Sequence, residues 1–235
     1  MSVEPDMKQD WNRRAQENAE FYIATSIEAG EAAFDASGQR DVRQFFDGLE
    51  HLLHPAQDVV DLGCGIGRMD RHVAPRVGSL VGVDVSGEMV RRATERLRGL
   101  ANVRFVEVDG WSFRPLEDGC AGLVFSHIVL QHTPRPVTLA YLRDAWRILR
   151  PGGSFVFQIP EAGPGAPGDP PGDDTFEMRY WAEGALRAEL DGLGFRWLEC
   201  RRFPVECEAF AMNYLRIHVQ RPTAVDAARR EQPAS

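Results

Sequence analysis

The feature that most constrains the fold is a glycine-rich turn, VVDLGCGIGRMD, at residues 59–70. Gly63, Gly65 and Gly67 alternate with other residues, an apolar pair precedes them, and a helix-like segment follows. Such a turn joins a buried strand to a helix and lets a ligand approach the backbone closely. The dinucleotide fingerprint requires a glycine where this turn has Arg68, so the turn departs from that fingerprint. Taken alone the three glycines are a weak signal, and a tight turn without any ligand is the alternative interpretation.

Strands and helices alternate after this turn, which is typical of an α/β fold with a parallel sheet and right-handed crossovers. Short apolar runs predict strands, and apolar residues at helical spacing predict helices between them. We expect strands at 79–85, 102–109, 121–127 and 154–160, and helices at 87–100, 136–149 and 182–193. Two late segments, 195–203 and 213–221, predict strands that pair antiparallel.

The length of 235 residues suits one domain, over residues 1–235. Apolar stripes predict helices at 7–27 and 41–53, which together make a helical cap (7–53) before the core (54–220). Prolines and glycines crowd the stretch 161–178, so we expect a mobile loop there. Residues 221–235 read as a frayed tail.

Three acidic residues follow three successive predicted strands. Asp61 ends the strand before the glycine turn, and Asp84 and Asp109 end the next two. Because the carboxyl ends of parallel strands meet at one edge of a sheet, these side chains point toward one crevice. An acid after the second strand can accept both hydroxyls of a ribose, and one after the third can accept from the exocyclic amine of a purine.

Charge decides between the ligands that such a crevice could hold. A pyrophosphate beside Asp61 would be repelled, whereas an ammonium or sulfonium group would be attracted. Arg68, in the first turn of the next helix, is placed to take the carboxylate of the same ligand. A ligand that combines adenine, ribose and a cationic amino acid is S-adenosylmethionine.

The chain resembles the class I S-adenosylmethionine-dependent methyltransferases. The matching segments lie in the order and spacing of that family and cover about residues 58–160; they read DLGCGIGR (61–68), VGVDVSGEMV (81–90), VEVDGW (106–111), GLVFSHIVLQHTP (122–134) and LRPGGSFVF (149–157). The resemblance implies a Rossmann-like, seven-stranded sheet of order 3-2-1-4-5-7-6, with strand seven antiparallel and an N-terminal helical extension.

The resemblance also implies roles for individual residues. The methionine part of the cofactor would approach Gly63 and Gly65, the ribose would bind Asp84, and Ser126 would lie near the transferable methyl group. The residues expected around the adenine are Val85, Met89, Asp109, Gly110 and Trp111. The N-terminal helix resembles that of bacterial methyltransferases acting on sugars and secondary metabolites, including those of antibiotic biosynthesis, in which side chains placed like Trp11, Arg14 and Tyr22 cover the cofactor.

Composition narrows the class of partner. The net charge of −8 disfavours a nucleic-acid partner and suits a neutral or cationic small molecule. We expect neither a membrane span nor a signal peptide, and therefore a cytoplasmic protein. The four cysteines form no C-x-x-C pair, so we expect reduced thiols and no metal site. The sequence is compatible with a homo-oligomer.

Two histidines after the fourth strand are candidate catalytic bases, because a hydroxyl or ammonium acceptor must lose a proton. His127 follows Ser126 directly, and His132 lies five residues further on, where a role in ordering the loop is the plainer interpretation. The leading hypothesis is an N-methyltransferase acting on an aminosugar or aminoglycoside. The 161–178 loop, with five acids and no basic residue, would favour such a cation if it closes over the substrate; solubility of a disordered loop is the alternative interpretation. The alternatives are an O-methyltransferase acting on a sugar or phenolic hydroxyl and a non-catalytic cofactor-binding module.

Overall fold

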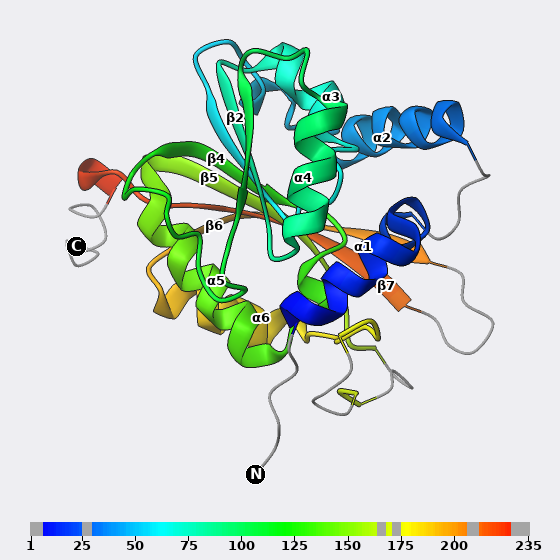
Figure 1. Ribbon diagram of the computed structural model, residues 1–235. Helices are drawn as coiled ribbons and strands as arrows, with labels where there is room; N and C mark the ends of the chain where they lie inside the picture. The colour runs from blue at the N-terminus through cyan, green and yellow to red at the C-terminus, as the bar shows by residue number, and fades with distance from the viewer. Residues whose placement is uncertain (1–6, 25–29, 164–167, 171–174, 206–211, 227–235) are drawn as a thin grey trace, which may run out of the picture.

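A seven-stranded sheet of order β3-β2-β1-β4-β5-β7-β6 runs through the molecule in the computed structural model, which describes residues 7–24, 30–163, 168–170, 175–205 and 212–226 (Figure 1). The strands are β1 (Asp58–Leu62), β2 (Ser79–Asp84), β3 (Val103–Glu107), β4 (Ala121–Ser126), β5 (Leu149–Pro160), β6 (Arg196–Val205) and β7 (Met212–Gln220). Strand β7 is antiparallel to both of its neighbours, whereas β1 to β5 pair in parallel. The predicted fold class, strand order and antiparallel strand are thereby confirmed.

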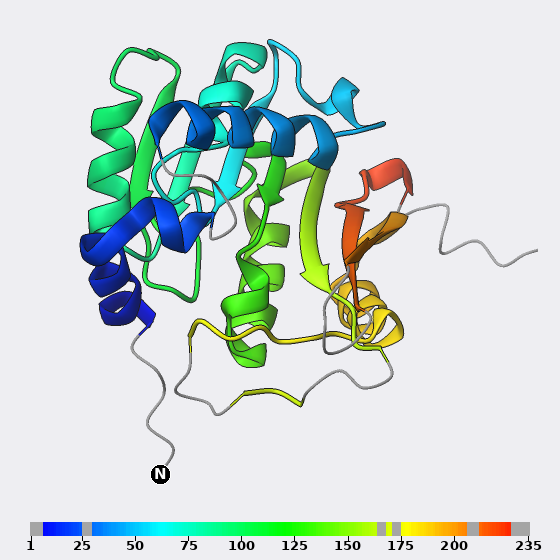
Figure 2. The same cartoon turned by 90° about the vertical axis from the view of Figure 1, so that its right-hand side faces the viewer.

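Helices cover both faces of this sheet (Figures 1 and 2). One face packs against α5 (Arg135–Ile148) and α6 (Glu183–Gly192) in the larger apolar core. The other packs against α2 (Glu31–Phe45) and α3 (Asp70–Val73), through side chains such as Phe45 and Phe125. Helix α4 (Gly87–Arg96) lies against β2 and β3. Because both faces are covered, β4 is buried at every one of its positions and the carboxyl ends of the strands become the natural place for a site.

The N-terminal helices lie beside the carboxyl ends of β1 and β2. Helix α1 (Met7–Ile23) packs against α4, and the Oδ1 atom of Asn12 accepts a hydrogen bond from the Ser86 hydroxyl at 2.8 Å. The expected helix at 41–53 is wrong in position. Helix α2 begins at Glu31 and ends at Phe45, and a short 3-10 turn, η1 (Glu50–Leu52), follows it.

A close approach explains where α2 lies. Gly38, in the middle of this helix, faces the Arg68 carbonyl so closely that any Cβ would overlap it. A mid-helix glycine reads as a helix breaker from the sequence alone, because it disfavours the helix by about 1 kcal/mol relative to alanine. Here the glycine instead lets α2 come against the glycine turn.

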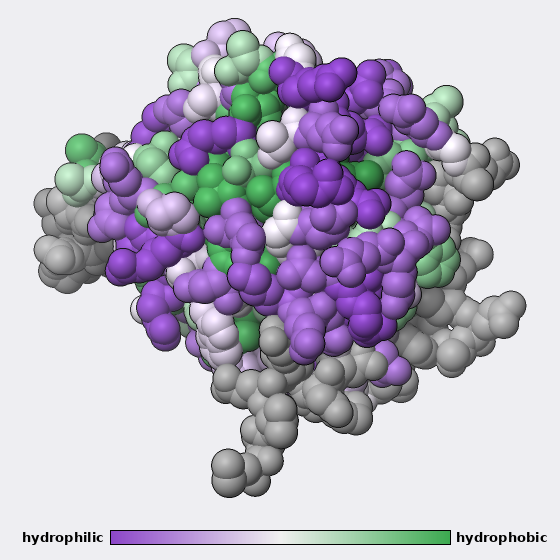
Figure 3. Space-filling model, viewed as in Figure 1, coloured by the Kyte–Doolittle hydropathy of each residue, from purple (hydrophilic) through white to green (hydrophobic). Residues whose placement is uncertain are grey.

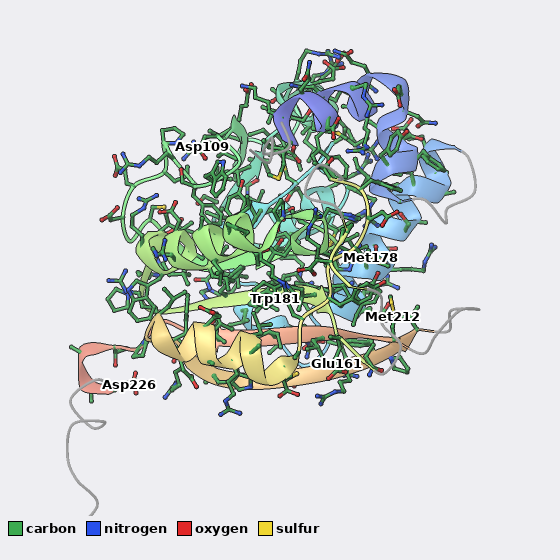
Figure 4. All side chains as sticks on the ribbon, turned by 90° about the horizontal axis from the view of Figure 1, so that it is seen from below. Asp109, Glu161, Met178, Trp181, Met212 and Asp226 are labelled. Carbon is green, nitrogen blue, oxygen red and sulfur yellow. The ribbon has the colours of Figure 1, made fainter. Side chains whose placement is uncertain are left out.

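The described parts of the predicted loop, 161–163, 168–170 and 175–178, contact different elements: the Glu161 amide donates to the Asn213 carbonyl of β7, Asp169 pairs with Arg135 of α5, and the Thr175 hydroxyl accepts from Arg14 of α1. Glu161 forms an isolated bridge with Trp181, and Figure 4 shows both in one region with Met178 and Met212. The Glu161 carboxylate also accepts hydrogen bonds from the Arg202 guanidinium. The rest of the predicted loop, 164–167 and 171–174, and the tail over 227–235 lie outside the described residues.

The face seen in Figure 3 is mostly hydrophilic, with smaller hydrophobic areas between the charged side chains. Within the described ranges, every helix is too short or too polar to cross a lipid bilayer.

Candidate functional site

A cavity lies at the carboxyl ends of β1, β2 and β4. Its volume, including its opening to solvent, is about 920 Å³. We name it the strand-end cavity, because Asp61 and Leu62 of β1, Asp84 of β2 and His127 after β4 all line it.

The glycine turn forms one wall of the strand-end cavity. Gly63, Gly65 and Gly67 have φ values of +77°, +53° and +75°, which side chains other than glycine rarely adopt. A Cβ on Gly65 would lie 2.7 Å from Cδ1 of Ile23 on α1. The turn therefore needs glycine both for its backbone and to let α1 come close above it.

Two carboxyl groups meet in this cavity. Asp84 Oδ2 accepts a hydrogen bond from the Gly65 amide at 3.0 Å, and its Oδ1 accepts from the Ser86 amide at 2.8 Å. Burial raises the pKa of Asp84 to about 6, against which the amide hydrogen bonds act. Burial, followed by the charge of Asp70, raises the pKa of Asp61 well above its ordinary value. Such carboxyl groups attract hydroxyl and ammonium donors and repel phosphates.

Arg68 lines the same cavity, although α2 holds its guanidinium. Its Nη1 lies 2.6 Å from Asp41 Oδ2 and donates to the Ser37 hydroxyl at 3.1 Å. The side chain is almost completely buried. The charge that we expect to face a cofactor carboxylate is therefore already paired with an acid that the sequence did not single out.

The chain turns sharply after β4. Ile128 has a φ of +59°, which is strained for a β-branched residue. On one side of it, His127 lines the strand-end cavity with its ring 5.2 Å from that of Phe45. On the other side, the Val129 side chain packs so tightly on Gly63 that a Cβ there would overlap it. The strain therefore places an imidazole and an apolar wall beside the glycine turn.

His127 is a neutral imidazole inside this wall. Burial lowers its pKa to about 4, and its Nδ1 atom has no hydrogen-bond partner in the described part of the chain. At neutral pH such a ring is uncharged, with one nitrogen that can accept a hydrogen bond and one N–H that can donate.

Aromatic rings surround His132, in the 3-10 turn η3 (Leu130–His132). Its ring stacks on Phe176 at 5.8 Å and meets the edge of Trp11 at the same centroid distance. Its Nε2 lies 3.0 Å from Nε2 of Gln131. His132 therefore holds α1 and the 175–178 segment together, and it also lines the cavity.

Arg14 fastens the same two elements. Its Nη1 donates to the Thr175 hydroxyl at 2.5 Å, and that hydroxyl donates to Asp10 at 2.9 Å. The guanidinium also lies 5.1 to 5.9 Å from the centroids of three aromatic rings, those of Trp11, Tyr22 and Phe176. We name this arrangement the Arg14 clasp.

Most of the residues predicted from the sequence come together here. Those that line the strand-end cavity are Trp11, Tyr22, Asp61, Gly63, Gly65, Arg68, Asp84, Val85, Met89, His127 and His132. Five others lie outside this lining: Arg14, Asp109, Gly110, Trp111 and Ser126.

These five are nevertheless close to the cavity or to its supports. The Asp109 carboxylate accepts hydrogen bonds from the backbone amides of Trp111 and Ser112, and Trp111 is 41% exposed. A Cβ on Gly110 would touch Val85 at 3.1 Å, so this glycine backs the cavity wall. Ser126 is fully buried and donates its hydroxyl to the Leu62 carbonyl at 3.0 Å, which ties β4 to β1.

Sequence reasoning missed several residues of the site. Tyr141 of α5 lines the cavity, and Ser37 and Asp41 bind Arg68. Asp70 is completely buried beside Asp61. The sequence did hold a signal for Asp70, since a charged residue three positions after Gly67 is unexpected where a short helix must pack. The roles of Tyr141, Ser37 and Asp41 depend on contacts between elements that are distant in the sequence.

A second cavity adjoins the first. It has a volume of about 1540 Å³, including its opening to solvent, and shares Tyr22, Ile23, Arg68, Ile128 and His132 with the strand-end cavity. We name it the neighbouring cavity. Its other walls come from α2, from β7 and from the segment after Thr175, with rings such as Phe176, Tyr180 and Tyr214.

Residues 59–153 match a family model described as a methyltransferase domain. The segment contains the glycine turn, both cavity acids and the strained turn after β4. Residues 59–153 thus form a methyltransferase domain, and the sheet has the strand order expected of the class I S-adenosylmethionine-dependent methyltransferases.

The matched region is similar to curated proteins whose names differ. An uncharacterized 37.1 kDa protein in transposon TN4556 of Streptomyces fradiae is 38% identical over 111 residues, 46% of this chain and 31% of that protein. Phosphoethanolamine N-methyltransferase 1 of Zea mays is 28% identical over 141 residues, 60% of this chain and 27% of that protein. The chain thus spans less than a third of the length of these curated relatives.

A solved structure shows that the fold extends beyond the matched domain. The cyclase SpnF aligns with a TM-score of 0.71 at 17% identity, over 95% of this chain and 100% of that chain. At this identity the similarity establishes the fold alone.

The residues of the strand-end cavity fit S-adenosylmethionine. Buried carboxyl groups from β1 and β2 suit its ammonium and ribose, and the apolar side chains of Val85, Met89 and Met7 suit its adenine. The glycine turn leaves no side chain where the ligand would pass the backbone. The two carboxyl groups disfavour a pyrophosphate, and the Arg68 guanidinium of the described lining is already paired with Asp41, so the residues do not fit a nicotinamide dinucleotide.

Proposed function

We propose that the protein transfers a methyl group from S-adenosylmethionine to an amine of a small molecule, and that an aminosugar is the first class to test. The observation that carries methyl transfer is the strand-end cavity with two carboxyl groups at adjacent strand ends beside a glycine turn. The neighbouring cavity, which shares a wall of five residues with it, would hold the acceptor.

The choice of an amine rests on His127. A neutral amine can attack without losing a proton first, whereas a hydroxyl needs a base while it reacts. With its pKa lowered to about 4 by burial, His127 is a weak base at neutral pH. In this mechanism the acceptor held in the neighbouring cavity extends its amine into the strand-end cavity, where His127 accepts a hydrogen bond from it and orients the lone pair. The related N-methyltransferase of Zea mays is named for methylation of an amine as well.

The chain's other contributions are binding and the exclusion of water. Asp84 orients the nucleoside through a carboxylate fixed by two backbone amides, and Asp61 faces the ammonium. The Arg14 clasp holds α1 beside the 175–178 segment at the edge of both cavities. When bound, the cofactor supplies an electrophilic methyl group on a sulfonium. Alignment and exclusion of water then carry much of the rate.

The acidic loop supports a cationic acceptor less than its composition indicates. Of its acids within the described residues, Glu161 is paired with Arg202, and Asp169 is paired with Arg135 at 2.6 Å. Glu177 lines the neighbouring cavity, together with Asp41. Arg40 and Arg68 line it too, so selectivity for a cation depends on where the acceptor lies inside the cavity.

Methylation of a sugar or phenolic hydroxyl is the second candidate, and one observation favours it. His132 lines both cavities among aromatic rings that would pack against a planar acceptor, and it is the candidate base for such a reaction.

The deciding experiment combines the protein, methyl-labelled S-adenosylmethionine and a panel of aminoglycosides, aminosugars, matched deoxysugars and simple phenols. Mass spectrometry measures the gain of one methyl group, and fragmentation identifies the nitrogen or oxygen that receives it. The Asp84→Asn variant, which should bind the donor at least tenfold more weakly because a hydrogen bond to a charged group is lost, is the negative control. Stoichiometric donor binding without transfer to any acceptor would favour a non-catalytic binding module.

A further inference from the structure

A buried pair of carboxyl groups lies beneath the strand-end cavity. Asp61 belongs to β1 and Asp70 is the first residue of α3, and their carboxyl groups are in direct contact. Asp61 is 5% exposed and lines the cavity, whereas Asp70 is 0% exposed. Within the described residues, neither carboxyl oxygen of Asp70 has a hydrogen-bond donor. The proposed mechanism makes no use of Asp70.

Two ionised carboxylates in contact and out of water repel each other strongly, so such a pair retains a proton. A proton shared between the two carboxyl groups supplies the hydrogen-bond donor at their contact, and an otherwise unpartnered buried oxygen of Asp70 then has a partner. Burial raises the pKa of Asp70 to about 7 and, with the charge of Asp70, raises the pKa of Asp61 well above its ordinary range.

Four other charged or titratable groups lie around the pair in the described part of the chain, and none of them donates a proton to it. The Asp84 carboxyl, on β2, accepts from two backbone amides. The Arg68 guanidinium, which lowers the pKa of Asp61, is paired with Asp41 of α2. Burial raises the pKa of the Cys64 thiol well above its ordinary value, so that this group stays neutral. His127, after β4, is neutral near pH 7 because burial lowers its pKa to about 4.

We propose that Asp70 is a positioning residue for the methyl donor: it shares one proton with Asp61, so that the pair keeps a single negative charge beside the ammonium of the cofactor. The inference rests on the proposed function, since it takes Asp61 to face that ammonium. The ligand group concerned is the α-ammonium of an amino acid.

A specific pH dependence follows. Above about pH 7 the pair holds one proton and one negative charge, and below it a second proton neutralises the pair. Affinity for a cationic group therefore falls as the pH decreases from 8 to 6. In Asp70→Asn the amide donates the same hydrogen bond but carries no charge, so Asp61 stays ionised to a lower pH. Because one proton changes affinity by at most tenfold per pH unit, we expect the loss between pH 8 and pH 6 to be about tenfold larger in the wild type than in this variant.

The experiment measures the affinity for S-adenosylhomocysteine by calorimetry at pH 8 and pH 6. This probe has the amino acid but lacks the sulfonium charge, so the ammonium is the cation that responds. Asp70→Ala, which removes the donor, should bind more weakly than Asp70→Asn at both pH values. Glu95→Gln, which removes an exposed carboxylate from α4, is the control and should follow the wild type. Asp84 remains in every variant, so its own titration cancels in the comparison.

The outcomes separate the two proposals. Failure of the wild type to bind the probe at either pH overturns the proposed function together with this inference. Binding in which Asp70→Asn loses affinity between pH 8 and pH 6 as the wild type does overturns the inference alone, as does equal binding by Asp70→Ala and Asp70→Asn. Carbon NMR of the aspartate carboxyl groups tests the wild type without relying on a variant: a carboxyl that titrates near pH 7 supports the pair, and its absence refutes it.

Discussion

His127 shows how one residue's environment decides its chemistry. Its imidazole is enclosed by Phe45 and by the strained turn at Ile128, and burial lowers its pKa to about 4. A solvent-exposed histidine would titrate near pH 6.5 and would be a better base at neutral pH. The ring is therefore better suited to hydrogen bonding with the methyl acceptor than to taking up a proton as a base.

This interpretation predicts the behaviour of His127→Asn and His127→Phe. Asparagine keeps a hydrogen-bonding group, and phenylalanine keeps only the shape of the ring. We expect turnover to fall by about tenfold or more in His127→Phe, the loss associated with one catalytic hydrogen bond, and by less in His127→Asn. The affinity for S-adenosylhomocysteine should remain within about twofold of the wild type, because no cofactor group is assigned to this ring.

The pH dependence of turnover separates this hydrogen-bonding role from general-base catalysis. With a pKa of about 4, His127 stays neutral from pH 5.5 to 8, so the turnover of His127→Asn should vary with pH as the wild type does. A rate that falls in the wild type near pH 6.5, and not in His127→Asn, would instead mean that the histidine acts as a general base. Loss of turnover and affinity together would assign it to cofactor binding.

At the scale of elements, α1 and the 175–178 segment are joined by the Arg14 clasp. The Arg14 side chain is 10% exposed, and a hydrogen bond to a charged group contributes about 1.5 to 3 kcal/mol. We expect Arg14→Ala to lower the free energy of unfolding by about that amount and to raise the KM for the acceptor, because the edge of both cavities loosens. Chemical denaturation and steady-state kinetics measure the two effects.

Arg13 is the matched control for that variant. It is the neighbouring residue on α1, its side chain is 56% exposed, and it pairs with Asp10 and Glu17 on the surface. Exposed ion pairs contribute at most about 1 kcal/mol. An equal loss of stability or of acceptor affinity in Arg13→Ala and Arg14→Ala would show that the Arg14 clasp contributes no more than an exposed ion pair does.

The elements differ in how far the sequence determines them. The glycine turn and the buried strands β1 and β2, which carry Asp61 and Asp84 near their ends, could be predicted, because local apolar runs and glycine chemistry specify them. The start of α2 could not, since Gly38 reads as a breaker until its contact with the Arg68 carbonyl is known. The apolar stripe behind the wrong assignment was nevertheless sound, because Val42, Phe45 and Phe46 are buried.

The candidate site divides in the same way. Residues that come directly after strands, such as Asp84 and His127, could be placed from the sequence, because strand ends share one edge of the sheet. The partners that set their charge could not. Asp41 reaches Arg68 from another helix, and the contact between Asp70 and Asp61 depends on how α3 returns over β1.

At the scale of the whole molecule, buried titratable groups oppose one another as the pH changes. Burial raises the pKa of Asp84 to about 6 and lowers the pKa of His218 to about 4. The carboxyl group stabilises the folded state less as the pH rises, since its unfolded form ionises first. The histidine has the reverse effect, because it stabilises the folded state less as the pH falls. Comparing the stability of the wild type with that of a variant at this histidine isolates its effect.

His218 lies on β7, 6% exposed, with its Nε2 2.9 Å from the Ser154 hydroxyl of β5. Glu199 raises its pKa, and His51 and Arg216 lower it, but burial is the largest cause of the shift. The folded pKa lies below the unfolded value near 6.5, so the unfolded state takes up a proton first and stability falls as the pH decreases from about 6.5 toward 4.

His218→Asn retains a donor for Ser154 and cannot take up a proton. Between pH 7.5 and pH 5 we expect the wild type to lose about 2 kcal/mol more of its free energy of unfolding than this variant, as urea denaturation followed by circular dichroism would show. His54→Asn, which replaces an exposed histidine, is the control and should change with pH as the wild type does. Parallel pH curves for His218→Asn and the wild type would mean that the imidazole gains a proton inside the folded sheet, with the Glu199 charge outweighing its burial.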